Sequence, residues 1–185
     1  MMTNFIGLYD DVLSDEECYK LIEHYHSFKH VNGKCWIDGN LAVDTSVKKC
    51  VELPEGHFDN PKHKLIYDII YNKLVNYTKK YLDEYPSLRY TARWTIDGDY
   101  SFKKYKDESD GFHTWHTEAA LSNKRVLVWM FYLNDAESGT EFQYYPTVKA
   151  KRGRLIIWPA GWTHYHRSEL NKGLKYIISG WYSFY

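Results

Sequence analysis

The stretch that decides the fold class is residues 90–105, Tyr-Thr-Ala-Arg-Trp-Thr-Ile-Asp-Gly-Asp-Tyr-Ser-Phe-Lys-Lys-Tyr. Up to Ile96 its apolar side chains recur at every second position, which is the period of a half-buried strand. Asp97-Gly98 is a hairpin-type turn signal, so we expect a second strand over 100–105. The chain therefore changes here from a helical to an extended pattern.

Short strands continue after this point. We expect them over 125–133, 140–144, 147–149, 154–158, 162–167 and 175–182, separated by the turn signals 134–135, 138–139, 151–153, 159–161 and 171–173. Closely spaced strands with no helices between them are typical of an antiparallel sandwich or barrel.

Two helices are expected before these strands. Ser14-Asp15-Glu16-Glu17 is a capping box, and it predicts a helix over 15–27. A second helix is predicted over 61–84, where one face carries Leu65, Ile66, Ile69, Ile70, Leu74, Tyr77 and Tyr81. Helices followed by strands indicate an α+β fold with a jelly-roll-like core of two sheets. Because no repeat or linker interrupts the chain, we expect 1–185 to form a single domain.

Charge and composition exclude several partners. Lys+Arg and Asp+Glu both number 24, and this balance leaves no basic footprint for nucleic acid or an anionic membrane. The longest apolar run, Val126 to Leu133, is far shorter than the ~20 residues that span a bilayer. Three cysteines without CxxC spacing and an N-terminus without a signal-peptide pattern favour a cytoplasmic protein.

Four of the nine histidines fall in two tight groups, His113 with His116 and His164 with His166. In an extended strand residues i and i+2 point to the same face, so His116 and Glu118 would present an imidazole and a carboxylate to one point. His164 or His166 would supply a third ligand. Two histidines and one carboxylate form the facial set that leaves coordination positions open on non-haem Fe(II).

A solvated strand or a zinc site would also account for these histidine groups. A lone His-x-Glu triplet occurs often on a solvated strand, and zinc accepts His and Glu ligands as readily. The HExxH signature of metalloproteases is absent, and neither histidine group has a cysteine nearby. No nucleophile elbow and no Gly-rich phosphate loop is found either, so serine-type catalysis and nucleotide binding have little support.

Six segments in the second half resemble the 2-oxoglutarate/Fe(II)-dependent dioxygenases, specifically their prolyl 4-hydroxylase-like branch. In the order of that family they are Tyr105, 111–118, 125–135 (with Tyr-Leu-Asn at 132–134), 139–142 (Gly-Thr-Glu-Phe), 149–159 and 173–181. Residues 5–6 and 13–18 match the family's opening helix more weakly. The resemblance implies a double-stranded β-helix (jelly-roll) core with N-terminal supporting helices.

The resemblance also implies a metal site. His116, Glu118 and His166 would bind Fe(II) as the catalytic centre, with Glu118 standing where the family usually has Asp. The family places its distal histidine about nine or ten residues before a basic co-substrate residue. His166 lies nine residues before Lys175, and His164 lies eleven residues before it, so His166 is chosen. His164, on the same strand face, would then contact a metal ligand or line the pocket.

The co-substrate 2-oxoglutarate would bind through Lys175, assisted by the hydroxyls of Tyr105 and Tyr132. With O2, the family's reaction converts 2-oxoglutarate to succinate and CO2 and hydroxylates a C–H bond; a need for ascorbate is left open. The branch implies a proline-containing peptide or protein as substrate. Loops 31–41 and 107–111 are predicted to be mobile lids over it.

Three alternatives remain open at this point. A dioxygenase of this kind could act on another amino acid, a nucleobase or a small molecule. A jelly-roll module could hold a metal and catalyse nothing. A purely structural sandwich could carry its histidines on the surface. The oligomeric state cannot be read from the sequence.

Overall fold

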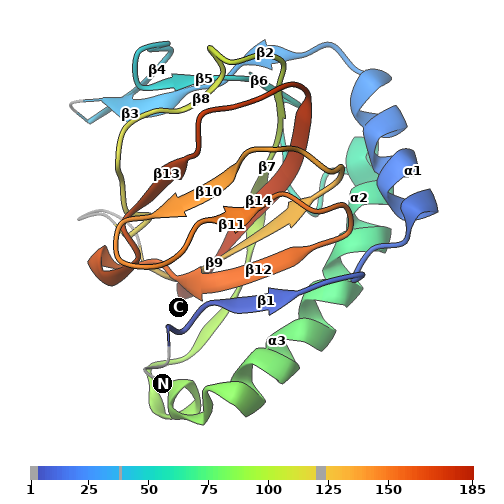
Figure 1. Cartoon of the computed structure of the whole chain (residues 1–185). Helices are drawn as coiled ribbons and strands as arrows, with labels where there is room; N and C mark the ends of the chain where they lie inside the picture. Colours follow the sequence, from blue (N-terminus) through green and yellow to red (C-terminus); the bar gives the residue numbers. More distant parts are fainter. Residues whose placement is uncertain (1–3, 38, 120–123) are drawn as a thin grey trace.

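The computed structural model describes residues 4–37, 39–119 and 124–185 (Figure 1). Residues 1–3, on which the expectation of no signal peptide partly rests, lie outside that part, as does residue 38 of the predicted 31–41 loop. None of the helices in the described ranges combines the length and apolarity needed to cross a membrane.

The helices and strands follow one another in the order shown by the labels of Figure 1. They are β1 (Gly7–Tyr9), α1 (Asp15–His26), β2 (Val31–Asn32), β3 (Cys35–Ile37), β4 (Asn40–Ala42), β5 (Lys48–Lys49), β6 (Val51–Glu52), η1 (Pro61–His63), α2 (Lys64–Ile66), η2 (Tyr67–Tyr71), α3 (Asn72–Glu84), η3 (Pro86–Tyr90), β7 (Trp94–Tyr105), β8 (Gly111–Phe112), β9 (Arg125–Tyr132), β10 (Gly139–Phe142), β11 (Val148–Lys149), β12 (Leu155–Pro159), η4 (Trp162–His164), β13 (His166–Ser168) and β14 (Lys175–Phe184).

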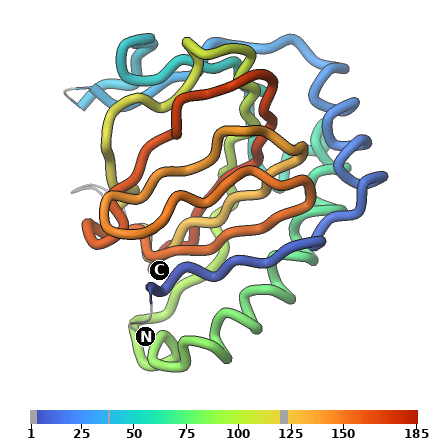
Figure 2. Tube along the Cα trace, viewed as in Figure 1, coloured from blue at the N-terminus to red at the C-terminus, as the bar shows by residue number. Residues whose placement is uncertain are grey.

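A seven-stranded sheet forms the centre of the described structure, with the strand order β1-β12-β9-β14-β7-β6-β2 and antiparallel pairing throughout. Figure 2 shows the N-terminal strand β1 in blue beside β12 in orange, although some 150 residues separate them in sequence. A smaller sheet, β11-β10-β13, lies against one face. Helices followed by antiparallel strands confirm the predicted α+β class.

Alternation along the central strands produces two hydrophobic cores. On β9, Trp129 and Phe131 face the helices and pack with residues such as Leu21 and Ile70. Val128 and Tyr132 face the opposite way and belong to a second cluster that includes Phe142 and Val148 of the smaller sheet. Because successive side chains of a strand point to opposite faces, a single strand supplies both cores.

The first predicted helix is confirmed with its cap. The Ser14 hydroxyl accepts from the Glu17 backbone N–H at 3.2 Å, and the Glu17 carboxylate accepts from the Ser14 backbone N–H at 2.8 Å. The second predicted helix is helical from Pro61 to Glu84, but it is not one regular helix. It begins as a 3-10 turn in which the Lys62 backbone N–H donates to the Asn60 side chain, and it passes through a π-helical turn over Tyr67–Tyr71 before α3.

The predicted hairpin at Asp97-Gly98 is wrong. β7 runs without a turn from Trp94 to Tyr105, because it pairs with β14 on both sides of residues 97–99, where the register shifts. At Gly98 the chain instead passes close to the His57 ring, since a Cβ there would lie 2.2 Å from His57 Nε2.

Two further differences concern short elements. The predicted strand 162–167 is a 3-10 turn over Trp162–His164, and β13 starts only at His166. The N-terminal strands β1 to β6 were not predicted, because segments of two or three residues are too short to show a period of two. The remaining predicted C-terminal strands correspond to β9, β10, β11, β12 and β14.

Candidate metal centre and its pocket

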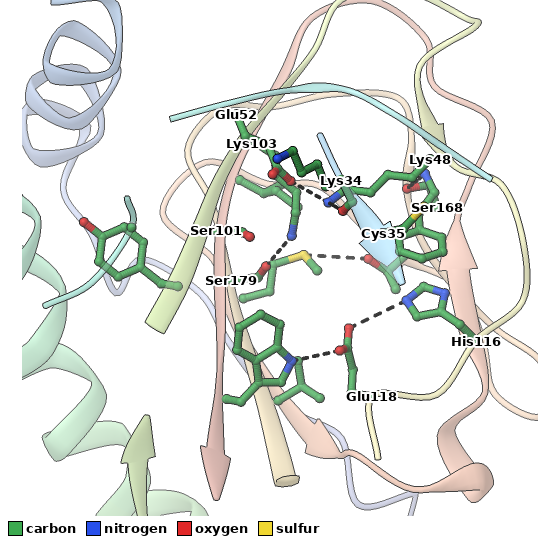
Figure 3. Close-up of a pocket in the computed structure, with 18 of the residues that line it drawn as sticks. Lys34, Cys35, Lys48, Glu52, Ser101, Lys103, His116, Glu118, Ser168 and Ser179 are labelled. Atoms are coloured by element: carbon green, nitrogen blue, oxygen red, sulfur yellow. Dashed lines mark hydrogen bonds and ion pairs between the residues drawn. The ribbon is translucent and has the colours of Figure 1, made fainter. Parts of the chain in front are cut away.

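A cavity of about 1000 Å³ opens on the face of the central sheet that carries the smaller sheet. The central strands β7, β9 and β14 supply one wall, and the β3–β4 hairpin contributes Trp36 and Leu41 at another. Figure 3 shows side chains from these elements converging on the cavity.

His116, Glu118 and His166 lie together in this cavity. One ligand atom from each residue lies within 4.8 Å of the others, and this is the candidate metal-binding group among the residues described. Glu118 Oε1 is 3.6 Å from His116 Nε2 and 3.9 Å from His166 Nε2. The backbones of His116 and His166 are joined by two hydrogen bonds, an isolated antiparallel bridge that fixes the spacing of the two imidazoles.

Both imidazoles are oriented for metal binding through Nε2. His116 Nδ1 lies 3.1 Å from the Thr114 carbonyl, and His166 Nδ1 lies 2.8 Å from the His164 carbonyl. A carbonyl accepts only, so each Nδ1 carries a proton, and each Nε2 faces the Glu118 carboxylate. Burial, together with the neighbouring His116, lowers the pKa of His166 to about 3, which keeps its ring neutral.

Two donors from the described part of the chain hold the second oxygen of Glu118. Arg125 donates to Oε2 at 2.9 Å, and the Trp181 indole N–H donates to the same atom at 2.9 Å. The Arg125 guanidinium also stacks 3.5 Å above the Trp181 ring. Burial would raise the pKa of Glu118, but His116, His166 and Arg125 outweigh burial and hold it well below its usual range. The carboxylate is therefore ionised, with Oε1 turned to the imidazoles.

Lys175 is a buried cation on the wall of the same cavity. Its residue is 2% exposed, and its ammonium donates to the Ser138 hydroxyl at 3.0 Å. Within the described ranges no ion pair connects the Lys175 ammonium to a carboxylate. Burial lowers the Lys175 pKa to about 8, and the more distant Glu169 offsets only part of this effect. A buried cation in this situation fits an incoming carboxylate.

Both candidate tyrosines line this cavity near Lys175. Tyr105 is the cross-strand partner of Lys175, whose ammonium lies 5.0 Å from the centre of the Tyr105 ring. The Tyr132 hydroxyl lies 2.6 Å from Thr140 Oγ1, on the neighbouring strand β10. The six predicted site residues therefore all line one cavity.

His164 lies apart from the three candidate ligands. Its Nε2 is 2.8 Å from the Asn4 carbonyl, and its residue sits in the η4 turn rather than on a shared strand face with His166. The His164 ring does not line the cavity, because the turn directs it toward the N-terminal segment, but the His164 carbonyl accepts from His166 Nδ1, so the expected contact with a candidate ligand is present through the backbone. Of the two predicted lids, loop 31–41 lines the cavity and loop 107–111 does not. In loop 107–111 the buried Asp110 forms an ion pair with Lys49.

Sequence reasoning missed two charged residues of the site. Arg125 had no motif signal beyond its position at the start of a predicted strand. Lys103 had one, since it shares a strand face with Tyr105 two positions away and therefore points into the same cavity.

The second half of the chain matches a known protein family. Residues 100–183 match the family described as the 2OG-Fe(II) oxygenase superfamily. No curated protein sequence matches the chain significantly. The family match confirms the resemblance seen in the sequence over the second half of the chain, and it implies Fe(II), 2-oxoglutarate and O2.

Several solved structures are similar over almost the whole chain. The viral collagen prolyl hydroxylase of Paramecium Bursaria Chlorella virus-1, with bound 2OG, is 18% identical with a TM-score of 0.64, covering 98% of this chain and 97% of that one. A prolyl hydroxylase from Trichoplax adhaerens, in complex with a hypoxia inducible factor peptide fragment, is 16% identical with a TM-score of 0.66 (98% and 84%). A Pseudomonas putida prolyl-4-hydroxylase is 12% identical with a TM-score of 0.69 (99% and 94%). At these identities the likeness establishes a shared fold.

Proposed function

We propose that this chain is an Fe(II)- and 2-oxoglutarate-dependent dioxygenase that hydroxylates a C–H bond of a peptidyl proline. Residues 1–185 would work as one domain, with the facing sheets forming a double-stranded β-helix. The observation that carries the proposal is that one cavity contains both the His116–Glu118–His166 donors and the buried Lys175 ammonium.

The donor set fits Fe(II). Two imidazole Nε2 atoms and one carboxylate oxygen make a facial set that leaves positions for a co-substrate and O2. Bound Fe(II), 2-oxoglutarate and O2 together supply the oxidation, in which 2-oxoglutarate becomes succinate and CO2 and one oxygen atom enters the substrate. Glu118 is one methylene longer than the Asp usual in this family, and the donors on its Oε2 fix where its Oε1 points.

Lys175 would bind the carboxylate of 2-oxoglutarate that is remote from the metal. Its ammonium is held between the Ser138 hydroxyl and the face of the Tyr105 ring, so it is oriented before the co-substrate arrives. The Tyr132 hydroxyl, now bonded to Thr140, is near enough in the same wall to add a second donor.

A prolyl substrate is supported by the fold and by the cavity mouth. The similar structures described above are prolyl hydroxylases, and the one from Trichoplax adhaerens is in complex with a peptide fragment. In this chain the β3–β4 hairpin exposes 73% of Trp36 and 54% of Leu41 beside the cavity. Such apolar and aromatic surface suits an extended peptide.

The test is succinate formation from 2-oxoglutarate with Fe(II) and ascorbate under air, because many such enzymes turn over slowly without their prime substrate. We expect turnover in the wild type, none in His116→Ala, and a raised 2-oxoglutarate requirement in Lys175→Ala. Lys172→Ala is the matched control, since Lys172 is exposed three residues away.

If the wild type forms no succinate, 2-oxoglutarate binding to the Mn(II)-loaded protein decides the matter. Binding without turnover would mean that oxidation is strictly coupled to the prime substrate, and proline-containing peptides would then be screened. Absence of binding would overturn the proposal in favour of a metal-holding module without catalysis.

A further inference from the structure

Lys103 places a second ammonium group in the cavity, separate from Lys175. It lies on β7 opposite Ile177 of β14, whereas Lys175 lies opposite Tyr105. The two lysines are thus offset by two residue positions along the paired strands, about 7 Å, and both face the cavity. The Lys103 ammonium donates to the Ser179 hydroxyl at 2.8 Å. Figure 3 shows the Lys103 side chain directed to the side of the cavity that holds Glu118.

The nearest carboxylate to Lys103 is already paired with a different lysine. Glu52 is the cross-strand neighbour of Lys103, but its Oε1 accepts from Lys48 Nζ at 2.5 Å. Lys48 also donates to the Lys34 carbonyl at 2.9 Å, so this pair ties β6 to the start of the β3–β4 hairpin. Within the described residues no ion pair joins Lys103 to a carboxylate. The group Lys48, Glu52 and Lys103 therefore carries two positive charges and one negative charge, and the surplus positive charge is that of Lys103.

That surplus charge is poorly solvated. Lys103 is partly buried, and burial together with the neighbouring Lys48 lowers its pKa. An ammonium in a partly buried position gains most from a negatively charged ligand, because a charge-assisted hydrogen bond replaces the hydration it has lost. Lys103 lines the same cavity as the three candidate metal ligands and the β3–β4 hairpin, and a substrate must enter this cavity to reach the metal.

We propose that Lys103, with the Ser179 hydroxyl, binds a carboxylate of the prime substrate, so that the substrate is a peptide with an acidic side chain close to the oxidised residue. This inference rests on the proposed function, because it assigns the 2-oxoglutarate carboxylate to Lys175. The two sources of a carboxylate, co-substrate and prime substrate, are therefore separated by the experiment.

The first arm measures 2-oxoglutarate binding by calorimetry to the Mn(II)-loaded protein without oxygen, where no turnover occurs. We expect Lys175→Met to weaken binding by roughly 10- to 100-fold, the range for a lost charge-assisted hydrogen bond. Lys103→Met should weaken it by less than about threefold on the same scale. An equal loss in both variants would assign Lys103 to the co-substrate and overturn the inference.

The second arm selects binders from a displayed library of random dodecapeptides on the same Mn(II)- and 2-oxoglutarate-loaded protein. Asp or Glu should recur at one fixed position with the wild type, with Lys103→Arg and with Lys104→Met, but not with Lys103→Met. Lys104 is the matched control because it precedes Tyr105 on the same strand, points to the opposite face and lies 5.4 Å from the Tyr176 ring. A selected peptide should bind the wild type ~10-fold more weakly after its acid is changed to the amide.

Selection without a fixed acidic position, or with the same acidic preference in Lys103→Met, would overturn the inference. A melting curve of each variant shows whether it is folded, and Lys103→Arg keeps the test valid if Lys103→Met is not. Absence of 2-oxoglutarate binding to the wild type in the first arm would instead overturn the proposed function, before any peptide is added.

Discussion

Two histidine clusters lie in different parts of the molecule and differ in what surrounds them. In the strand region, His116 and His166 turn Nε2 toward a carboxylate on the wall of a cavity. In the helical region, His24 Nε2 lies 3.2 Å from His63 Nδ1, and His63 Nε2 lies 3.1 Å from the Pro54 carbonyl. The helical pair has no carboxylate in its hydrogen bonds and does not line the cavity.

The difference shows that close histidines do not by themselves make a metal site. In the helical pair, His24 Nε2 and His63 Nδ1 are in contact with each other, and His63 Nε2 is in contact with the Pro54 carbonyl. The pair therefore fills a structural role between α1 and η1. In the strand region only the Nδ1 atoms are used by carbonyls, which leaves Nε2 for a ligand. An ionised carboxylate and an open cavity complete the site.

The largest expected effect separates the two clusters directly. His166→Ala removes one of three donors, so Mn(II) affinity should fall by more than ~100-fold, since loss of an outer partner alone costs ~10–100-fold. His24→Ala should leave the affinity unchanged. Calorimetric Mn(II) titration measures both. Equal losses would mean that the strand cluster has no special role in metal binding.

A second prediction concerns the donors that orient Glu118. Trp181→Phe keeps the ring but removes the N–H that donates to Oε2, and Mn(II) affinity should fall by ~10-fold. Trp162→Phe is the control, because Trp162 is 75% exposed. If Trp181→Phe binds Mn(II) as the wild type does, the Trp181 N–H is not needed to orient the carboxylate.

The smallest expected effect is the loss of folding stability at low pH that the His24–His63 pair causes. Burial, and then His63, lower the pKa of His24, so the unfolded chain takes up a proton that the folded chain resists. Stability is therefore fully present above about pH 6.5, the ordinary histidine value, and falls as the pH drops below it.

Thermal melts of the metal-free protein at pH 7.5 and 5.5 test this sign. The melting temperature should fall on acidification, and the fall should be smaller in His24→Gln. An unchanged pH dependence in that variant would show that other groups, such as His164, whose pKa is also lowered by burial, account for it.

Much of the fold was predictable because its signals are local. The capping box at Ser14 and the turn signals at 134–135 and 171–173, which bound β9 and β14, depend on neighbours within a few residues, and the helix and both strands are confirmed. The Asp97-Gly98 hairpin was wrong because its local turn signal is overridden by pairing with β14, some 80 residues away in sequence. Tertiary pairing therefore decided the length of β7.

The sequence by itself determined the residue types of the candidate site, namely the His-x-Glu triplet, the distal histidine pair and Lys175. The spacing to Lys175 already favoured His166 over His164, and the structure places His166 beside the triplet. Only the tertiary structure decided that Arg125 and Trp181 hold Glu118 and that Lys103 enters the cavity. Strand period states which face a side chain takes but not which distant strand lies opposite. Contacts between residues 116 and 166 arise from that pairing, so they cannot be read from either segment alone.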